Sequence, residues 1–187
     1  MTDLLLIRHG ETDWNIEGRY QGQSDVPLNK EGLKQATDLA KRLQHEPIDA
    51  IFSSDLRRAQ KTAEILRDMS NAPLYLDPRL REIHQGEWEG LLFSDIRTRY
   101  AKAFEKRLHD PLQVAPPGGE TVGELRQRVL EAIDEIIVRY PRGLVAIVSH
   151  GLSLAIIKVQ FNNIAIEKVW DYIPDNANPE KINVEAE

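Results

Sequence analysis

Two apolar runs of the chain end in the same way: DLLLIRHG at residues 3–10 and LVAIVSHG at residues 144–151. Each run has the composition of a buried strand, and each leads into a histidine followed by a glycine, which lets the backbone approach a ligand closely. In an open sheet of parallel strands, ligands bind beyond the carboxyl ends of the strands. We therefore expect His9 and His150 to meet at that edge, where Arg8 makes an anion the expected ligand.

The rest of the chain alternates apolar, strand-like runs with stretches whose apolar residues recur at helical spacing. This alternation predicts an α/β fold, a three-layer sandwich with a mainly parallel central sheet flanked by helices. The predicted helices cover residues 30–44, 56–69, 93–108 and a long segment after Thr121, with a further helix after Gly151. The predicted strands cover residues 3–7, 48–53, 74–76 and 144–148, with weaker edge strands over 169–173 and 182–184.

Local signals mark where several of these elements begin. Thr121 with Glu124 three residues later is a capping box, which predicts a helix start. Ser53, Ser54 or Asp55 is expected to cap the helix over 56–69, and residues 11–28 are expected to form a polar loop. These signals agree with the alternation of strands and helices.

A polar, arginine-rich stretch interrupts this regular alternation. Residues 93–108 look helical but end in proline-rich sequence at residues 110–119, so we expect residues 91–118 to be a lid inserted into the fold. The length of 187 residues fits a single domain over 1–187 with a substantial core. The remaining histidines, expected on the surface or the lid, are His45, His84 and His109, of which His84 follows Glu82 closely enough to touch a substrate.

Composition excludes several classes of function. The chain is 41% hydrophobic and 29% charged, as is ordinary for a globular protein, and its net charge of -6 argues against a broad basic face for nucleic acid. It has no cysteine, which excludes disulfides and thiolate chemistry. No apolar run approaches the roughly 20 residues of a membrane helix, and no signal segment is visible, so we expect a cytoplasmic protein without membrane partners.

Two histidines and an arginine at one sheet edge suit phosphoryl transfer. A neutral imidazole is a good nucleophile toward phosphorus, and a covalent phosphohistidine divides one hard displacement into two easier ones. The transferring group spreads negative charge over its equatorial oxygens, which forked guanidinium groups can hold. Arg8 and one of the two histidines, if protonated, are candidates to hold that charge.

Other polar residues are expected to complete such a site. SSDLRRA at residues 53–59 runs from a strand end to a helix start, so it brings an arginine and free N–H groups to the same edge. Asn15, Gln21 and Gly22 follow the first strand and are candidate hydrogen-bond donors to phosphate oxygens. Glu82 follows the third strand and is placed to protonate a leaving alkoxide.

Five motifs in this order resemble those of the histidine phosphatase superfamily, in its phosphoglycerate mutase-like branch. The resemblance covers nearly the whole chain. Its motifs are residues 5–12 with Asn15 and 19–28, residues 53–59 with Thr62 and Ala63, residues 81–90, residues 117–120, and residues 149–151.

The resemblance implies a role for each matching residue. His9 matches the phosphorylated nucleophile, and Glu82 matches the proton donor. The residues that match the phosphate clamp are Arg8, Arg58 and His150. The residues that match other phosphate-contacting positions are Asn15, Gln21, Gly22 and Gly151. The family uses no metal, so we expect no cofactor, and a homodimer is a family-based expectation.

The segment after the acid separates two branches of this family. Mutases pass the phosphoryl group to another substrate, whereas phosphatases pass it to water. EIHQGEWEG at residues 82–90 departs from the Glu-Arg-His-Tyr-Gly-like stretch of the glycolytic mutases and resembles the phosphatase branch, which includes broad-specificity, α-ribazole phosphate, phosphoserine and sugar-phosphate types. We therefore expect a metal-independent phosphomonoesterase of the histidine acid phosphatase type that acts on small phosphorylated metabolites.

Three other interpretations stay open. A cofactor-dependent phosphoglycerate mutase would use the same nucleophile. A zinc site could join His9, His150 and Glu82, although no close pair such as His-x-x-x-His occurs. A non-catalytic phosphate-binding module would be expected to lack the nucleophile or the acid, and this chain has candidates for both.

Overall fold

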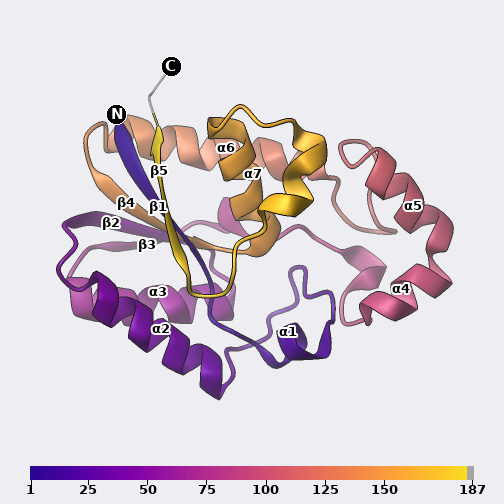
Figure 1. The fold of residues 1–187 in the computed structure, drawn as a ribbon, viewed down its shortest axis with the longest axis horizontal. Coiled ribbons are helices and arrows are strands. Elements are labelled where there is room, and N and C mark those ends of the chain that lie inside the picture. The colour runs from indigo at the N-terminus through magenta and orange to yellow at the C-terminus, as the bar shows by residue number, and fades with distance from the viewer. Residues whose placement is uncertain (185–187) are drawn as a thin grey trace.

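A five-stranded sheet forms the centre of the molecule (Figure 1) in the computed structural model, which describes residues 1–184. Across the sheet the strands run in the order β3-β2-β4-β1-β5. The pairs β3–β2, β2–β4 and β4–β1 are parallel, whereas β5 runs antiparallel to β1. The mainly parallel sheet is confirmed. The strands are β1 (Thr2–Arg8), β2 (Ile48–Ser53), β3 (Leu74–Leu76), β4 (Leu144–Ser149) and β5 (Pro179–Val184).

Helices cover both faces of this sheet, so the predicted three-layer sandwich is confirmed. In Figure 1, α6 and α7 lie on one face, and α2 and α3 lie on the other. The α-helices are α1 (Asp13–Glu17), α2 (Lys30–Leu43), α3 (Arg57–Ser70), α4 (Phe93–Arg99), α5 (Ala101–His109), α6 (Val122–Arg139) and α7 (Gly151–Phe161). The 3₁₀ turns are η1 (Pro78–Leu80), η2 (Gly86–Trp88) and η3 (Ile166–Tyr172).

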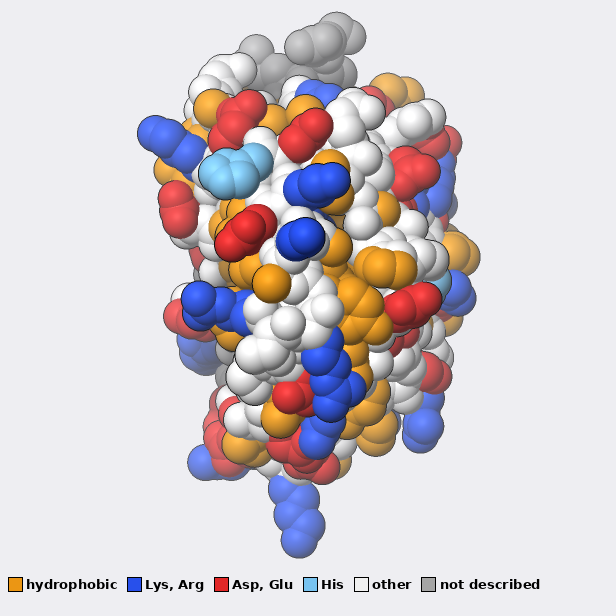
Figure 2. All heavy atoms as spheres, turned by 90° about the vertical axis from the view of Figure 1, so that its right-hand side faces the viewer, with side chains coloured by type: hydrophobic (Ala, Val, Ile, Leu, Met, Phe, Trp, Pro, Cys, Tyr) orange, Lys and Arg blue, Asp and Glu red, His pale blue; other side chains and the backbone are white. Residues whose placement is uncertain are grey.

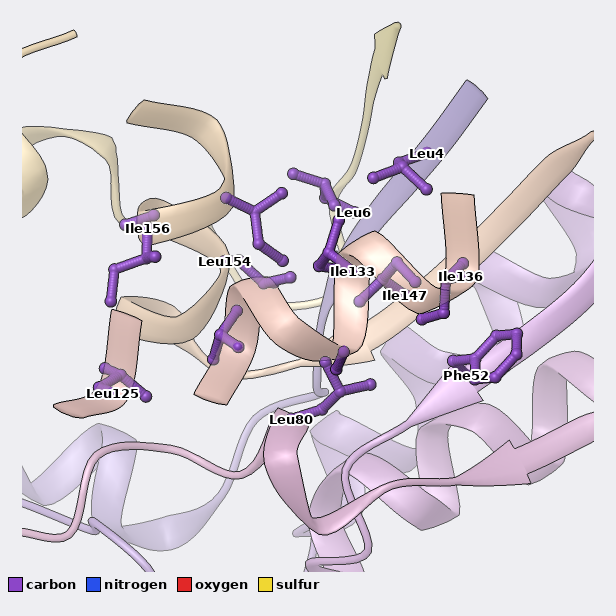
Figure 3. Packing of buried hydrophobic residues seen from close by; sticks show 14 of the residues in the cluster. Leu4, Leu6, Phe52, Leu80, Leu125, Ile133, Ile136, Ile147, Leu154 and Ile156 are labelled. Carbon is purple, nitrogen blue, oxygen red and sulfur yellow. The ribbon is translucent and has the colours of Figure 1, made fainter. Parts of the chain in front are cut away.

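The alternation of side chains along β1 supplies both hydrophobic cores. Leu4 and Leu6 point to the face of α6 and α7, where Figure 3 shows them close to Ile133. Leu5 and Ile7 belong to the second core, against α2 and α3. A leucine or isoleucine that is fully buried contributes roughly 2 kcal/mol of hydrophobic free energy. Because β1 is apolar on both faces, it takes a central place in the sheet, and this fixes the position of the residues that follow it.

Helix starts agree with the sequence in one case and differ in another. Thr121 and Glu124 form the predicted capping box of α6. The predicted side-chain cap of α3 is wrong, because the N-cap residue is Leu56, which has no side-chain hydrogen bond. Ser54 Oγ instead accepts the backbone N–H of Leu56 at 3.3 Å and contacts His150.

Three segments differ from the expected secondary structure. The expected loop over 11–28 contains the short helix α1, which has its own capping box at Thr12. The expected strand over 169–173 lies instead in η3, which packs against α7, because β5 already occupies the free edge of β1. The strand expected over 182–184 is confirmed and begins earlier, at Pro179.

The helix expected over 93–108 is divided into α4 and α5 at Tyr100. The division turns α5 so that Phe104 packs against both Phe93 and Trp88. In Figure 1 this α4–α5 segment lies beside the sheet, and Figure 2 shows hydrophobic side chains among charged ones on that side of the molecule. Within residues 1–184, no helix combines the length and apolar composition needed to cross a bilayer.

Candidate active site

His9 and His150 meet at the carboxyl edge of the sheet. Arg8 of β1 pairs in register with Ser149 of β4, so the two histidines directly follow neighbouring strands. The His9 N–H donates to Ser149 O at 3.0 Å, and the centroids of the two imidazole rings are 5.2 Å apart. Both side chains are buried. The structure thus brings together the two residues at which the sequence repeats its pattern.

The orientation of the His9 ring is set by the next residue. His9 Nδ1 lies 2.7 Å from Gly10 O, and because a carbonyl oxygen only accepts hydrogen bonds, Nδ1 carries the proton. This leaves Nε2 with its lone pair. Burial, together with the positive charges of Arg58 and Arg8, holds the pKa of His9 well below its usual range. His9 is therefore a neutral imidazole whose free nitrogen has the form of a nucleophile.

His150 contacts Ser54, which follows the neighbouring strand β2. Its Nε2 lies 2.8 Å from Ser54 Oγ, and its buried Nδ1 has no hydrogen-bond partner among residues 1–184. Burial and the positive charge of Arg58 hold the pKa of His150 well below its usual range, so the ring is neutral in the absence of an anion. An incoming anion would favour the protonated ring, which could then donate to it.

Two arginines lie beside these rings, of which Arg58 is buried and Arg8 is partly buried. Arg8 Nη1 donates to Pro174 O at 2.9 Å, while Arg58 donates through Nη1 to Ser24 O at 2.8 Å and through Nη2 to Gly22 O at 2.7 Å. Carbonyl groups orient a guanidinium without neutralising its charge. In each arginine the buried Nε has no partner within the described part of the chain. Burial lowers the pKa of Arg58 to about 10, so it remains a cation at neutral pH.

The adjacent Arg57 is exposed, whereas Arg58 is almost completely buried at the site. The structure therefore distinguishes two neighbours of the same type. Thr62, one helical turn later, donates to Arg58 O at 2.8 Å and accepts the Gly10 N–H at 3.1 Å. It links α3 to the residue after His9.

Glu82 lies at the N-terminus of α7. Its Oε2 accepts the N–H of Leu152 at 3.1 Å, and its Oε1 accepts the N–H of Ile83 at 3.0 Å and the hydroxyl of Ser153 at 3.3 Å. The charge of Glu82 acts on both Arg8 and Arg58, raising their pKa values against the effect of burial. A carboxyl group thus lies close to the two arginines, fixed by donors from the chain.

Arg128 of α6 holds the backbone that carries Glu82. It donates to the carbonyl oxygens of Arg79 and Arg81 at 2.7 Å each and to that of Glu82 at 2.9 Å. Its Nε and Nη2 also form a bidentate ion pair with Glu120. The sequence contained no signal for this role, because an arginine in an amphipathic helix is ordinarily a surface residue.

The expected phosphate-contacting residues differ in whether their polar atoms already have hydrogen-bond partners in the chain. Gly22 has a left-handed φ of 52°, and a side chain there would meet Glu89. Gln21 Oε1 is buried without a partner among residues 1–184. Gly151 begins α7, and a Cβ atom there would lie 3.7 Å from Arg8 Nε. Asn15 Oδ1, by contrast, accepts from Thr12 in the capping box of α1, so that oxygen is already engaged.

Gly10 is required for a different reason from the one expected. A Cβ atom at Gly10 would lie 2.4 Å from Gly32 O, so the glycine allows α2 to approach the end of β1. The sequence predicts a close approach of the backbone to a ligand here, whereas the structure shows an approach to α2. The contact packs the residue after His9 against α2.

The loop before β5 also reaches the site, which the sequence did not predict. Asn176 Nδ2 donates to His9 O at 2.8 Å, and the Ala177 N–H donates to Arg8 O at 2.9 Å. Arg8 in turn binds Pro174 O. No motif marked these residues, because they act through carbonyl groups and backbone contacts.

The described residues contain no cluster of three or more histidine, cysteine, aspartate or glutamate side chains arranged to hold a metal ion. His9, His150 and Glu82 therefore do not form the zinc site considered from the sequence. The histidines outside the site, His45, His84 and His109, are all exposed, as expected.

Known proteins resemble this chain over nearly its whole length. The sequence model of the histidine phosphatase superfamily (branch 1) matches residues 4–187. Phosphoserine phosphatase 1 of Hydrogenobacter thermophilus is 33% identical over 185 residues, covering 99% of this chain and 88% of that protein. A Serratia proteamaculans protein named "Probable phosphoglycerate mutase GpmB" is 35% identical over 154 residues, covering 82% of this chain and 72% of its own. The solved structure of Bacillus stearothermophilus YhfR, 39% identical, superposes with a TM-score of 0.88 and covers 99% of this chain and 92% of its own.

Proposed function

The chain belongs to the histidine phosphatase superfamily (branch 1), and we propose that it is a phosphoric monoester hydrolase that works through a covalent phosphohistidine at His9. The observation that supports this most directly is the state of His9. Its Nδ1 is bound to Gly10 O, its ring is neutral, and the positive charges of Arg58 and Arg8 act on it. An uncharged nitrogen nucleophile beside two guanidinium groups whose Nε atoms have no partner among residues 1–184 suits attack on a phosphate ester.

In the first step, His9 Nε2 attacks phosphorus in line with the ester oxygen. The N–P bond forms as the P–O bond to the leaving group breaks, and Glu82 donates its proton to the departing oxygen. Arg8, Arg58 and protonated His150 hold the equatorial oxygens, supported by Asn15, Gln21, Gly22 and Gly151. The unpaired Nε atoms of both arginines support this role.

In the second step, Glu82 as a carboxylate takes a proton from water while the water oxygen attacks phosphorus. The N–P bond breaks, inorganic phosphate leaves, and His9 returns to its neutral form. No metal takes part in either step. The substrate is a small phosphorylated metabolite, and the similarity to phosphoserine phosphatase 1 supports hydrolysis as the outcome.

The test is phosphate release from a panel of phosphomonoesters with EDTA present, scoring phosphoglycerate isomerisation in parallel. We expect EDTA-resistant release. His9→Ala should abolish it with the fold intact, and rapid quenching of the wild-type protein should trap phosphate on His9. His45→Ala, at an exposed histidine, is the matched control and should retain full turnover.

Three outcomes would contradict the proposal. Isomerisation without release would make the protein a mutase, in agreement with its GpmB relative. Binding of phosphate esters with neither activity would make it a binding module. Substantial turnover by His9→Ala would exclude the covalent scheme.

A further inference from the structure

Glu89 has no part in the proposed chemistry, yet its carboxylate binds two separate segments of the chain. Its Oε1 accepts the backbone N–H groups of Gln23 at 2.9 Å and of Gln85 at 3.1 Å, and its Oε2 accepts the hydroxyl of Ser24 at 2.6 Å. The side chain is only 15% exposed. A carboxylate that is withdrawn from water needs such donors. Glu89 therefore joins the loop after α1 to the segment that follows Glu82.

Two carbonyl groups of that loop orient Arg58. Gly22 O accepts from Arg58 Nη2 at 2.7 Å, and Ser24 O accepts from Nη1 at 2.8 Å. The carbonyl of Gly22 and the N–H of Gln23 belong to one peptide unit, which is planar and trans, so they point in opposite directions. This single peptide unit therefore lies between the carboxylate of Glu89 and the guanidinium group of Arg58.

The peptide unit is aligned with the two charges. Its N–H, the positive end of the peptide dipole, meets the carboxylate, and its carbonyl, the negative end, meets the guanidinium group. Hydrogen bonds to charged groups are stronger than neutral ones, and bonds in a chain polarise one another. Burial lowers the pKa of Arg58, and the charge of Glu89, after those of Glu82 and Asp25, acts against that effect. The two bonds thus support each other, and loss of the carboxylate would weaken both.

Gly22 is suited to this arrangement and other residue types are not. Its φ of 52° is left-handed, and a Cβ atom there would lie 2.2 Å from Glu89 Oε1. The carboxylate is also fixed from its own segment, because the Trp88 side chain is completely buried and the Glu89 N–H donates to Gly86 O at 3.1 Å. The sequence predicts Gly22 only as a phosphate-contacting residue, whereas the structure shows that Glu89 requires a glycine there.

The loop carbonyls decide how Arg58 faces an anion. They accept one N–H from each terminal nitrogen, while Nε is buried without a partner among residues 1–184. A guanidinium group is a planar fork, so two bonds at its terminal nitrogens fix the plane in which its other N–H groups lie. A rotation of the Gly22–Gln23 peptide unit would remove one of these bonds and turn the fork.

We propose that Glu89 is a positioning residue that holds Arg58 in its orientation toward the phosphate through the Gly22–Gln23 peptide unit. This inference deepens the proposed function and rests on it, because the anion is the transferring phosphoryl group. Glu89 acts through Arg58 and is not itself a phosphate ligand.

The test measures the binding of orthovanadate by isothermal titration calorimetry. Orthovanadate has the shape and charge of phosphate and adopts the five-coordinate form of the transition state, so its Kd reports how well the arginine is oriented. Glu89→Met keeps the approximate length of the side chain and removes both acceptor oxygens. We expect its Kd to be about 10-fold higher than that of the wild type, as for loss of a hydrogen bond to a charged group.

Two further variants separate the lost hydrogen bonds from other effects. Glu89→Gln keeps one oxygen for the two backbone N–H groups, and its amide can donate to the Ser24 hydroxyl, so its Kd should lie close to the wild-type value. Glu124→Met is the matched control, because Glu124 likewise accepts a backbone N–H and a hydroxyl, both from Thr121. It should lower the melting temperature and leave the Kd unchanged.

A double-mutant cycle with Arg58→Lys tests the route of the effect. Lysine keeps the positive charge but lacks the fork, so the group through which Glu89 acts is gone. The ratio of Kd between Glu89→Met and its parent should then fall from about 10 to about 1. A general loss of stability would instead raise the Kd by the same factor in both backgrounds.

Several results would overturn the inference. A wild-type Kd in Glu89→Met, with a lower melting temperature, would mean that the carboxylate stabilises only the fold. The same rise in both backgrounds would mean that Glu89 does not act through Arg58. A wild-type protein that does not bind orthovanadate would exclude an oxyanion site at Arg58 altogether. Binding of orthovanadate without hydrolysis of any ester would contradict only the proposed hydrolysis, because the cycle needs no turnover.

Discussion

At His9, one backbone carbonyl decides which ring nitrogen is free. Gly10 O binds Nδ1, so Nε2 keeps its lone pair, and burial keeps the ring neutral. The sequence placed a histidine at a strand end, but the choice of tautomer depends on the local backbone. The burial of Arg58 and the exposure of Arg57 also depend on the tertiary structure. The side of α3 that faces the site decides which of the two guanidinium groups is buried.

The two neutral histidines predict a pH dependence of stability. The unfolded chain takes up protons near pH 6.5, the ordinary histidine pKa, whereas the pKa values of His9 and His150 in the folded protein lie well below it. The contribution of these two groups to the free energy of unfolding is therefore fully present above pH 6.5. It is lost as the pH decreases below that value, by up to about 1.4 kcal/mol per pH unit for each group. Urea unfolding at a series of pH values measures this slope.

His150→Gln removes one of the two groups and should make this slope shallower. His45→Gln, at an exposed position, is the control. An unchanged slope in His150→Gln would mean that the buried ring does not account for the loss of stability in acid.

Glu82→Gln tests proton donation at a single atom. An alkyl phosphate has a poor leaving group that needs a proton, so its kcat should fall by about 10²- to 10⁴-fold. An activated ester such as p-nitrophenyl phosphate needs little help and should lose far less. Steady-state rates on the two esters measure the difference, and equal losses would assign Glu82 another role.

At the scale of elements, α6 connects the core to the candidate acid. Its apolar face packs in the first core, while Arg128 on the same helix binds three carbonyl oxygens of the segment before and at Glu82. The helix and its capping box could be predicted from spacing. The hydrogen bonds of Arg128 to these carbonyl groups could not be predicted. They join residues up to 49 positions apart, which only the packing of α6 on η1 brings together.

Arg128→Met should remove the hydrogen bonds that hold the backbone of residues 79–82. We expect the free energy of unfolding to fall by about 2 kcal/mol, because several hydrogen bonds and the pair with Glu120 are lost. Hydrolysis of alkyl phosphates should slow more than that of p-nitrophenyl phosphate, since Glu82 loses its support. Urea unfolding and rates on both esters measure this.

Arg126→Met, at an exposed position of the same helix, is the matched control and should change both quantities little. A loss of stability in Arg128→Met with the same effect on both esters would mean that the hydrogen bonds of Arg128 stabilise the fold and do not position Glu82.

At the scale of the whole molecule, the first and last strands of the sheet are neighbours, and the loop that leads into the last strand reaches the candidate site. β5 pairs with β1, and the loop before β5 binds the backbone of Arg8 and His9. The edge strand could be predicted from its apolar residues. Its antiparallel direction and the loop contacts could not, because they depend on which edge of the finished sheet is free.

Asn176→Ala should weaken the site without unfolding the protein. Loss of its hydrogen bond to His9 O should cost about 1 kcal/mol of stability and lower kcat several-fold, because His9 becomes less firmly held. Thermal unfolding and steady-state rates measure both effects. Asn178→Ala, at an exposed position of the same loop, should leave both near wild type, and a wild-type kcat in Asn176→Ala would contradict the role.

The homodimer expected from the family stays a prediction. Sedimentation velocity over a range of protein concentrations would show either one chain or a species of twice its mass. A single chain at all concentrations would contradict the expectation.

The sequence by itself determined the three-layer fold and the two histidines at neighbouring strand ends, because side-chain periodicity and motif spacing are local properties. Only the tertiary structure decided the neutral state of His9 and the hydrogen bond from Arg128 to the backbone of Glu82. Burial and long-range contacts produce these features: the Arg128–Glu82 bond spans 46 residues and the Asn176–His9 bond spans 167. Such contacts form only when the sheet register and the packing of the helices are complete.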